Sequence, residues 1–298
     1  MKYAPVSNIS HASLEDGEGI RTVVFLAGCG LNCRWCHNPE AISQSSKVMF
    51  YKDKCIGCKE CEKIDCPALC GDISSYDATA CNGCARCETE CLGDAIRLSS
   101  RKMSVSEVTL EVERDLRYYR HSGGGVTFSG GECLLYPDFM ECILSLCKER
   151  EIHTAVESSL FVPRENIVRL ISLIDKFYFD IKLIDPNEHR IYTSHSNERI
   201  LENAAYVLEN HPNVTVRIPL IPSVTDTEEN LFGILDFLSK APSLGEKRVE
   251  LLRYNSLADA KYSALGMRYE NFGKAQTIEE IYALKEALRE RYRGVDII

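Results

Sequence analysis

The chain has 298 residues, of which 45% are hydrophobic, with a formal net charge of −9 and 15 cysteines. This length can bury the core of one large domain or of two modest ones. The acidic balance argues against a nucleic-acid partner, because nucleic-acid binding usually needs a basic face. No apolar run approaches the roughly 18 residues of a membrane span, and the first residues open no signal peptide. We therefore expect a cytoplasmic protein without membrane association.

Twelve of the fifteen cysteines fall between Cys29 and Cys91. Such clustering predicts metal sites, because a disulfide framework would spread its cysteines through the fold. The first group, Cys29-x3-Cys33-x2-Cys36, directly follows the apolar residues 22–27, which predict a buried strand. Three thiolates do not complete the four-cysteine set of a structural zinc site or an ordinary cluster. We predict a [4Fe–4S] cluster with one iron open to a small ligand. A zinc site completed by His37 is the alternative, although its adjacency to Cys36 strains chelation of one ion.

Residues 51–95 form a second cysteine-rich unit of different composition. Its later part has the spacing of bacterial ferredoxins, C-x2-C-x2-C-x3-C, in which the fourth cysteine binds the other cluster. The expected ligand sets of two [4Fe–4S] clusters are Cys55, Cys58, Cys61 and Cys91, and Cys66, Cys81, Cys84 and Cys87. Cys70 is a surplus thiol or an alternative to Cys66, which we favour because Pro67 follows it. Two zinc ribbons are the other interpretation of this unit.

From residue 100 the pattern alternates between helices and strands. A capping-box signature, Ser104 with Glu107, opens a helix that runs to about residue 121 and is stopped by three glycines. The expected strands are residues 22–27, 126–129, 152–157, 176–183, 214–220 and 248–252. The further expected helices start at Pro137 and lie at residues 163–173, 198–210, 226–241 and 277–293. Six strand–helix units predict an α/β fold with a parallel sheet, either a partial (βα)6 barrel or an open doubly wound sheet. The barrel would comprise residues 1–50 and 96–298, with residues 51–95 as a ferredoxin-like insertion.

Polar residues follow several of these strands, where the chemistry of βα barrels collects. Gly130, Gly131 and Glu132 could hold a ligand of both charges with backbone amides and a carboxylate. Asp180 and Lys182 are two residues apart on an otherwise apolar strand, so both should point to the same face. Such buried charges need a ligand or one another. Glu157 ends the third strand, and Arg217 and Asn255 lie on or near the fifth and sixth strands; a lone Arg or Asn at such a position is more often structural than ligand-binding.

The cysteine loop with Trp35 resembles the cluster motif of the radical S-adenosylmethionine (SAM) superfamily. Other stretches resemble, over nearly the whole chain, the activating enzymes of glycyl radical enzymes, of which the pyruvate formate-lyase activators are examples. They are DGEGIR at residues 16–21, WCHNPE at 35–40, GGVTFSGGE at 124–132, DIK at 180–182, RIPLIP at 217–222 and KYSALG at 261–266.

The resemblance implies that SAM completes the open iron. One electron would cleave it to methionine and a 5′-deoxyadenosyl radical, which takes a hydrogen from a glycine of a partner enzyme. The implied catalytic residues are Cys29, Cys33, Cys36 and Lys182. The implied cofactor-binding residues are Trp35, Cys36, His37, Gly130, Gly131, Glu132, Glu157, Asp180, Ile181, Lys182, Arg217 and Asn255. Glu157 and Asp180 correspond to a monovalent-cation site, with Glu157 in place of the more usual Asp. Cys133 replaces a common Pro, and Asn255 replaces a common His.

The insertion narrows the resemblance further. Short-type pyruvate formate-lyase activators lack such an insertion. Residues 51–95 resemble instead the insertion of the activators for diol and glycerol dehydratases, choline lyase, sulfonate lyases, arylacetate decarboxylases and benzylsuccinate synthase. The extra clusters would relay electrons from a flavodoxin or ferredoxin, or would shape a docking surface. Two alternatives remain for the whole chain: a radical SAM enzyme acting on a small molecule or peptide, and a non-catalytic electron carrier.

Overall fold

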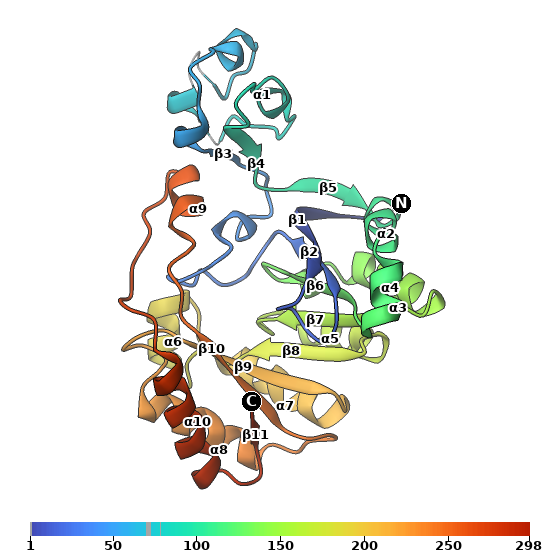
Figure 1. Cartoon of the computed structure of the whole chain (residues 1–298), viewed down its shortest axis with the longest axis vertical. Coiled ribbons are helices and arrows are strands. Elements are labelled where there is room, and N and C mark those ends of the chain that lie inside the picture. Colours follow the sequence, from blue (N-terminus) through green and yellow to red (C-terminus); the bar gives the residue numbers. More distant parts are fainter. Residues whose placement is uncertain (1, 70–72, 78) are drawn as a thin grey trace.

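The computed structural model describes residues 2–69, 73–77 and 79–298. The predicted alternative ligand Cys70 lies outside these residues. The strands of the main sheet are β1 (Tyr3–Ser13), β2 (Arg21–Leu26), β5 (Arg101–Ser104), β6 (Gly125–Gly130), β7 (His153–Ser158), β8 (Lys176–Asp180), β9 (Val214–Leu220), β10 (Arg248–Arg253) and β11 (Asp296–Ile297). Their order across the sheet is β11-β10-β9-β8-β7-β6-β2-β1-β5 (Figure 1).

The six predicted strands are parallel neighbours and follow one another across the sheet in chain order, from β2 through β6 to β10. A doubly wound sheet would reverse its strand order at a switch point, so the observed order is that of a barrel left open. Two antiparallel strands extend the sheet beyond β2: β1 pairs with β2, and β5 pairs with β1. The sequence pattern had predicted neither of these strands.

Helices cover one face of the sheet. They are α2 (Val105–Glu113), α3 (Leu116–Ser122), α4 (Pro137–Glu149), α5 (Arg164–Leu170), α6 (Pro186–Thr193), α7 (Glu198–Asn210), α8 (Glu228–Lys240) and α10 (Ile278–Arg291). The short helix α9 (Asp259–Ala264) lies outside this layer. Strand residues such as Val126, Phe128 and Val156 join residues of α2, α4, α7 and α8 in one buried apolar cluster. Because side chains alternate along a strand, the opposite face carries the residues between them, including Thr127 and Glu157. We call this second surface the polar face.

Most helices begin where the sequence predicts. Ser104 and Glu107 form the capping box of α2, with each side chain accepting a hydrogen bond from the other's backbone amide. The single helix expected up to residue 121 is instead divided into α2 and α3. At the break, the buried carboxylate of Asp115 accepts a 2.5 Å hydrogen bond from Thr22 on β2 and contacts His11 on β1. Contacts with the sheet therefore hold the chain at this break.

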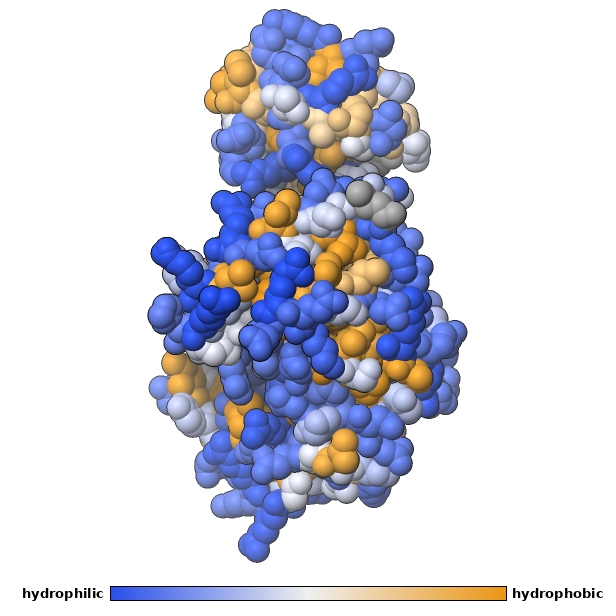
Figure 2. All heavy atoms as spheres, turned by 90° about the vertical axis from the view of Figure 1, so that its right-hand side faces the viewer, coloured by the Kyte–Doolittle hydropathy of each residue, from blue (hydrophilic) through white to orange (hydrophobic). Residues whose placement is uncertain are grey.

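Residues 51–95 belong to a small lobe that stands apart from the sheet (Figures 1 and 2). Its base is an antiparallel pair, β3 (Val48–Phe50) and β4 (Ile96–Leu98), and it contains the short helix α1 (Arg86–Thr89). The lobe has an apolar cluster of its own, formed by Val48, Leu69, Ile73, Cys87 and Ile96. The chain thus leaves and re-enters the main body through one hairpin base.

Two further findings concern the whole described chain. Every cysteine within the described residues is free of a disulfide bond. In the same residues, no helix combines the length and the apolar character that crossing a membrane requires.

Candidate active site

The loop that carries Cys29, Cys33 and Cys36 is anchored at the carboxyl end of β2. The amides of Gly28 and Cys29 donate to the carbonyls of Ala41 and Ile42, at 2.7 and 2.9 Å, which closes the loop on itself. The amides of Asn32 and Arg34 donate to the carbonyls at the end of α6, at 2.9 and 3.0 Å. We call residues 28–42 the cysteine loop. Its backbone is held on two sides before any ligand is considered.

The three cysteines of this loop are half-buried and their thiols are close to one another. Burial raises the pKa of Cys29, Cys33 and Cys36 to about 12, and their mutual repulsion adds to this, while nearby Lys182 acts in the opposite sense. A thiol of that pKa becomes a thiolate ligand at neutral pH only when an electropositive group binds and displaces its proton.

The sequence predicted two kinds of group for the three thiols, a [4Fe–4S] cluster or a zinc ion. Within the described residues, no three or more His, Cys, Asp or Glu side chains form a group that could hold one metal ion. A cluster makes no such demand, because each thiolate binds a different iron. Three neighbouring thiols on one rigid loop therefore fit a cluster better than a zinc ion.

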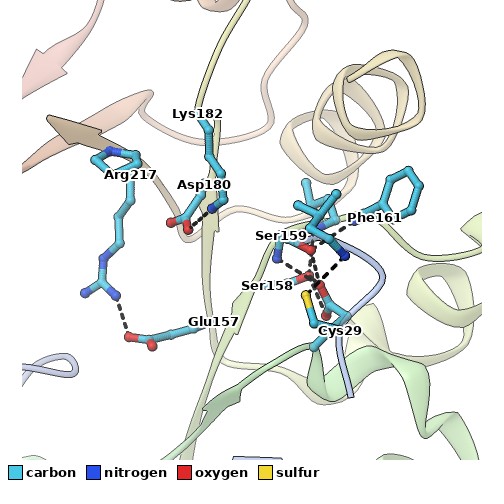
Figure 3. Close-up of polar contacts among 12 residues, drawn as sticks. Cys29, Glu157, Ser158, Ser159, Phe161, Asp180, Lys182 and Arg217 are labelled. Atoms are coloured by element: carbon cyan, nitrogen blue, oxygen red, sulfur yellow. Dashed lines mark hydrogen bonds and ion pairs between the residues drawn. The ribbon is translucent and has the colours of Figure 1, made fainter. Parts of the chain in front are cut away.

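Lys182 and Asp180 lie next to these thiols. The sequence had predicted that Lys182 lies on the same strand as Asp180. β8 instead ends at Asp180, so Lys182 lies just beyond it. Its ammonium is nevertheless 2.5 Å from the Asp180 carboxylate (Figure 3). Burial lowers the pKa of Lys182, but Asp180 and the thiols of Cys33 and Cys29 outweigh burial and raise it overall. Lys182 therefore brings a fixed positive charge to the site.

Two buried asparagines explain why the strand stops at Asp180. Asn230 on α8 donates to the carbonyl of Lys182 and accepts from the amide of Ile184, at 3.0 and 2.8 Å. Asn197, at the start of α7, donates to the next two carbonyls at 2.9 and 2.8 Å. These side chains replace the partners that a neighbouring strand would supply. The sequence analysis missed both residues; their position in the first turn of a helix was the available signal.

Glu132 is fully buried at the end of β6, where it faces the end of β7. Its carboxylate accepts hydrogen bonds from the hydroxyls of Ser158 and Ser159 and from the amide of Ser159, at 2.6–3.0 Å. Burial raises the pKa of Glu132, and these hydrogen bonds partly offset that rise. Ser158 and Ser159 are thus further site residues that the sequence analysis did not single out, although they follow Glu157 directly.

The turn at Gly130, Gly131 and Glu132 contacts the cysteine loop through its backbone. The amide of Gly131 donates to the carbonyl of Leu26, and that of Glu132 donates to the carbonyl of Gly28, both at 2.7 Å. These two amides are therefore engaged within the chain and hold the loop in place. A direct contact of residues 130–132 with a ligand stays a prediction.

A chain of charges crosses the polar face at the same end of the sheet. The Arg217 guanidinium donates to Glu157 (Figure 3). It also donates to Glu250, at 2.7 Å. Ser129 donates to the second oxygen of Glu157 at 2.6 Å, and Arg217 lies 4.1 Å above the Tyr178 ring. Burial lowers the pKa of Arg217, but the two carboxylates outweigh it and raise the value. Because Glu157 and Asp180 each already have a cationic partner, the predicted monovalent-cation site stays a prediction.

The remaining predicted residues lie on the cysteine loop, on the segment after β10 and just beyond β8. Trp35 is only 6% exposed and packs against Tyr192 and Phe272, with ring centroids 5.9 Å apart in both cases. His37 meets Asn255 through the backbone carbonyl of the latter, at 3.1 Å. Ile181 is buried, and its amide donates to the carbonyl of Arg217. The structure thus brings together the residues predicted near the strand ends, while their contacts with a cofactor stay predictions.

The small lobe contains two narrow hollows, of about 20 and 10 Å³. The cysteines that line the first are Cys55, Cys58, Cys61 and Cys91. The cysteines that line the second are Cys66, Cys81, Cys84 and Cys87. Each hollow is otherwise lined largely by apolar side chains, among them Phe50 and Ile96 in the first and Val48 and Leu98 in the second. The two hollows thus gather the eight cysteines of the two predicted ligand sets into two groups of four.

These features define a class of protein: an α/β fold whose parallel strands end at a buried three-cysteine loop flanked by a lysine and carboxylates. The Radical SAM superfamily model matches residues 23–235. The (2S)-3-sulfopropanediol dehydratase activating enzyme of Klebsiella oxytoca is 37% identical over 273 residues, which cover 89% of this chain and 86% of the relative. The indoleacetate decarboxylase activating enzyme of Tractidigestivibacter scatoligenes is 37% identical over 286 residues, with 90% and 88% covered.

One solved structure supports the fold. The crystal structure of a radical SAM methyltransferase from Sphaerobacter thermophilus has a TM-score of 0.53 and 14% identity, and the match covers 99% of this chain and 76% of that one. The chain belongs to the radical SAM superfamily and, within it, to the activating enzymes of glycyl radical enzymes.

Proposed function

We propose that the cysteine loop holds a [4Fe–4S] cluster through Cys29, Cys33 and Cys36 and that SAM binds beside it to activate a glycyl radical enzyme. The observation that carries this proposal is the meeting of three half-buried thiols with Lys182 at the carboxyl end of β2. When bound, the cluster and SAM supply the 5′-deoxyadenosyl radical that removes a hydrogen from a glycine of the partner.

The chain's own residues bind and orient the cluster and SAM and shield them from water. The hydrogen bonds from residues 131 and 132 to residues 26 and 28 hold the cysteine loop at a fixed place relative to β6. Lys182 offers a positive charge that attracts a carboxylate, such as that of an amino acid. Arg217 and Glu157 form an ion pair at the same end of the sheet. Burial of the thiols keeps water away from the reacting groups.

We further propose that residues 51–95 are a ferredoxin-like domain with two [4Fe–4S] clusters, inserted into a barrel of residues 1–50 and 96–298. The two four-cysteine hollows support this proposal, because their cysteines are those of the predicted ligand sets, with Cys66 in the second. The separate apolar cluster of the lobe supports the boundaries. In this arrangement a flavodoxin or ferredoxin donates electrons to the lobe, which passes them to the cluster of the cysteine loop. The location that we propose for the protein is the cytoplasm.

The partner is a glycyl radical enzyme, and we place it outside the short-type pyruvate formate-lyases. Two relatives of equal identity to this chain are named as activators of a sulfopropanediol dehydratase and of an indoleacetate decarboxylase. Equal identity to both means that overall similarity does not choose between them. We therefore propose a diol or glycerol dehydratase, a choline or sulfonate lyase, or an arylacetate decarboxylase as the class of partner.

The test is anaerobic reconstitution of the wild type, Cys33→Ala and, as a matched control, Cys142→Ala on α4. We expect Cys33→Ala to lose SAM cleavage and about a third of its iron and sulfide, since one of three clusters is removed, while the control keeps both. SAM cleavage retained in Cys33→Ala, or a wild type that binds zinc without iron, would contradict the proposal. A glycyl doublet in the electron paramagnetic resonance (EPR) spectrum of a co-incubated partner separates this function from a radical enzyme that acts on a small molecule.

A further inference from the structure

A segment after β10 crosses the outer side of the cysteine loop. We call residues 254–276, between β10 and α10, the strap, and it contains the helix α9 and the KYSALG stretch. In Figure 1 this part of the chain runs from the main body up to the small lobe. Glu270 of the strap binds Arg34 of the loop through two hydrogen bonds of 2.7 and 2.5 Å. The strap therefore touches the loop directly, although the function proposed above gives it no role.

Lys261 makes the most concentrated contact between the two segments. Its ammonium donates to the carboxylate of Glu40 at 2.6 Å, to the side-chain oxygen of Asn38 at 2.9 Å and to the backbone carbonyl of His37 at 3.1 Å. All three acceptors lie within four residues after Cys36. One side chain thus holds three points of the same short stretch, which is more than a chance surface ion pair provides.

Glu40 depends on this lysine. Its side chain is 12% exposed, and one carboxylate oxygen is buried without a hydrogen-bond partner among the described residues. Cys36 and Tyr262 lie within range of its charge. Without Lys261, a largely buried carboxylate would remain uncompensated beside Cys36, which is strongly unfavourable.

The same helix also contacts the small lobe. α9 packs against the turn Pro39–Ala41 of the cysteine loop and against β3 at the base of the lobe. Tyr262, next to Lys261, is buried at this junction. The helix thus links the two places where the proposed function puts clusters.

We propose that Lys261 is a positioning residue, which fixes the end of the cysteine loop against the base of the small lobe and balances the charge of Glu40 beside Cys36. This inference rests on the proposed function for its consequence at the cluster. For the apoprotein it stands alone, because the contacts of Lys261 involve only residues of this chain.

The charge balance predicts the sign of an effect on the cluster. Net charge near an iron–sulfur cluster is among the factors that set its reduction potential. Lys261→Met leaves Glu40 as an uncompensated anion, so the midpoint potential of the loop cluster should become more negative. Lys261→Arg keeps the charge and should stay near the wild type. Lys261→Met combined with Glu40→Gln removes both charges and should return the potential toward the wild-type value.

The first measurement uses the full chain with its iron. EPR-monitored titrations follow the signal that changes on addition of SAM, with the SAM-insensitive signals of the lobe as an internal reference. Lys274→Met removes a charge from an exposed site on the same strap and serves as the matched control. A Lys261→Met potential equal to that of the wild type and of Lys274→Met would overturn the charge-balancing role.

The second measurement uses the metal-free full chain. Hydrogen exchange of residues 37–42 should be at least tenfold faster in Lys261→Met than in the wild type and Lys274→Met, while exchange in β6 and β7 stays unchanged. Equal exchange in all three would overturn the positioning role. If the wild type forms no SAM-sensitive cluster, the proposed function fails, and the exchange result still decides whether Lys261 holds the loop.

Discussion

Charged side chains on the polar face are buried in pairs, and each pair depends on both members. Arg217 has side-chain exposure of 10% and Glu157 of 19%, so neither charge is well solvated. Removing one member of such a pair leaves the other as an unpaired buried charge. The free energy of unfolding that a single substitution removes therefore differs from the net contribution of the intact pair to stability.

Replacing Arg217 by Met should destabilise the metal-free protein by about 3–5 kcal/mol, because Glu157 loses its counter-charge. Glu157→Gln should cost less, because Arg217 keeps Glu250 as its partner. The double variant should cost clearly less than the sum of the two, since Glu157→Gln removes the carboxylate that Arg217→Met alone leaves unpaired. Urea unfolding of the four proteins measures this coupling, and strict additivity would show that the pair does not act as a unit.

His153 gives the polar face a pH dependence. Burial lowers the pKa of His153, and the neighbouring Arg21, 3.4 Å away, lowers it further. The folded-state pKa thus lies below the unfolded value near 6.5. The folded state therefore resists protonation, and the stability present above pH 6.5 is lost as the pH falls through the folded pKa.

We expect the free energy of unfolding of the metal-free protein to decrease between pH 7.5 and pH 5.5, and to decrease less in His153→Gln. The exposed His121 provides the control, since His121→Gln should leave the pH profile unchanged. Urea unfolding at several pH values gives both slopes. A His153→Gln slope equal to that of the wild type would assign the pH dependence to other groups.

At the scale of elements, the junction of β6 with the cysteine loop leaves no room for a side chain at residue 131. A Cβ atom at Gly131 would lie 2.4 Å from the carbonyl oxygens of Ala41 and Gly28, both of which are backbone atoms. Gly131→Ala should therefore destabilise the protein by roughly 1–3 kcal/mol or more, as overpacking does. Gly294 has open space around it, so Gly294→Ala should be nearly neutral. Thermal unfolding compares the two; equal midpoints would show that the junction can shift to accept the methyl group.

The elements that the sequence predicted correctly are those with a strong local signal. β9 combines a short apolar run with β-branched residues, and its bounds, Val214–Leu220, are those expected. β1 gave no such signal, because only Ala4 and Val6 of its eleven residues are fully buried and its polar residues follow no strict alternation. The end of β8 depends on Asn230, and the break after α2 depends on the hydrogen bond between Asp115 and Thr22; both contacts join segments that are distant in the chain. Local patterns do not contain such long-range partners.

Prediction of the site followed the same division. Cysteine spacing and polar residues at strand ends could be recognised locally, so the residues that the structure brings together at the strand ends were named, while their roles stay predictions. The roles of Ser158 and Ser159 toward Glu132, and of Lys261 toward Glu40, exist only once separate segments meet. Sequence separation, 221 residues for the latter pair, is the physical reason that they were missed.

At the scale of the whole molecule, the main body and the small lobe have separate apolar cores. Their covalent connection is the pair β3 and β4, in which Phe50 stands opposite Ile96 and the amide of Tyr51 donates to the carbonyl of Ala95 at 2.7 Å. Two residues facing each other in this way can be joined by a two-residue hairpin turn. The lobe is therefore expected to be removable without unfolding the sheet.

We predict that replacing residues 52–94 by Asn-Gly, with Val48→Thr and Ile96→Thr on the newly exposed hairpin, leaves a folded protein. Its thermal midpoint in the metal-free form should stay within about 5 °C of the wild type, a shift of the order of 1 kcal/mol. After reconstitution it should hold about one third of the wild-type iron. It should cleave SAM with dithionite, because the cysteine loop is intact, but much more slowly with reduced flavodoxin. If the shortened variant cleaves SAM equally fast with dithionite and with reduced flavodoxin, the lobe takes no part in electron delivery. Weaker binding of the partner enzyme to the variant would then indicate that the lobe has a docking role.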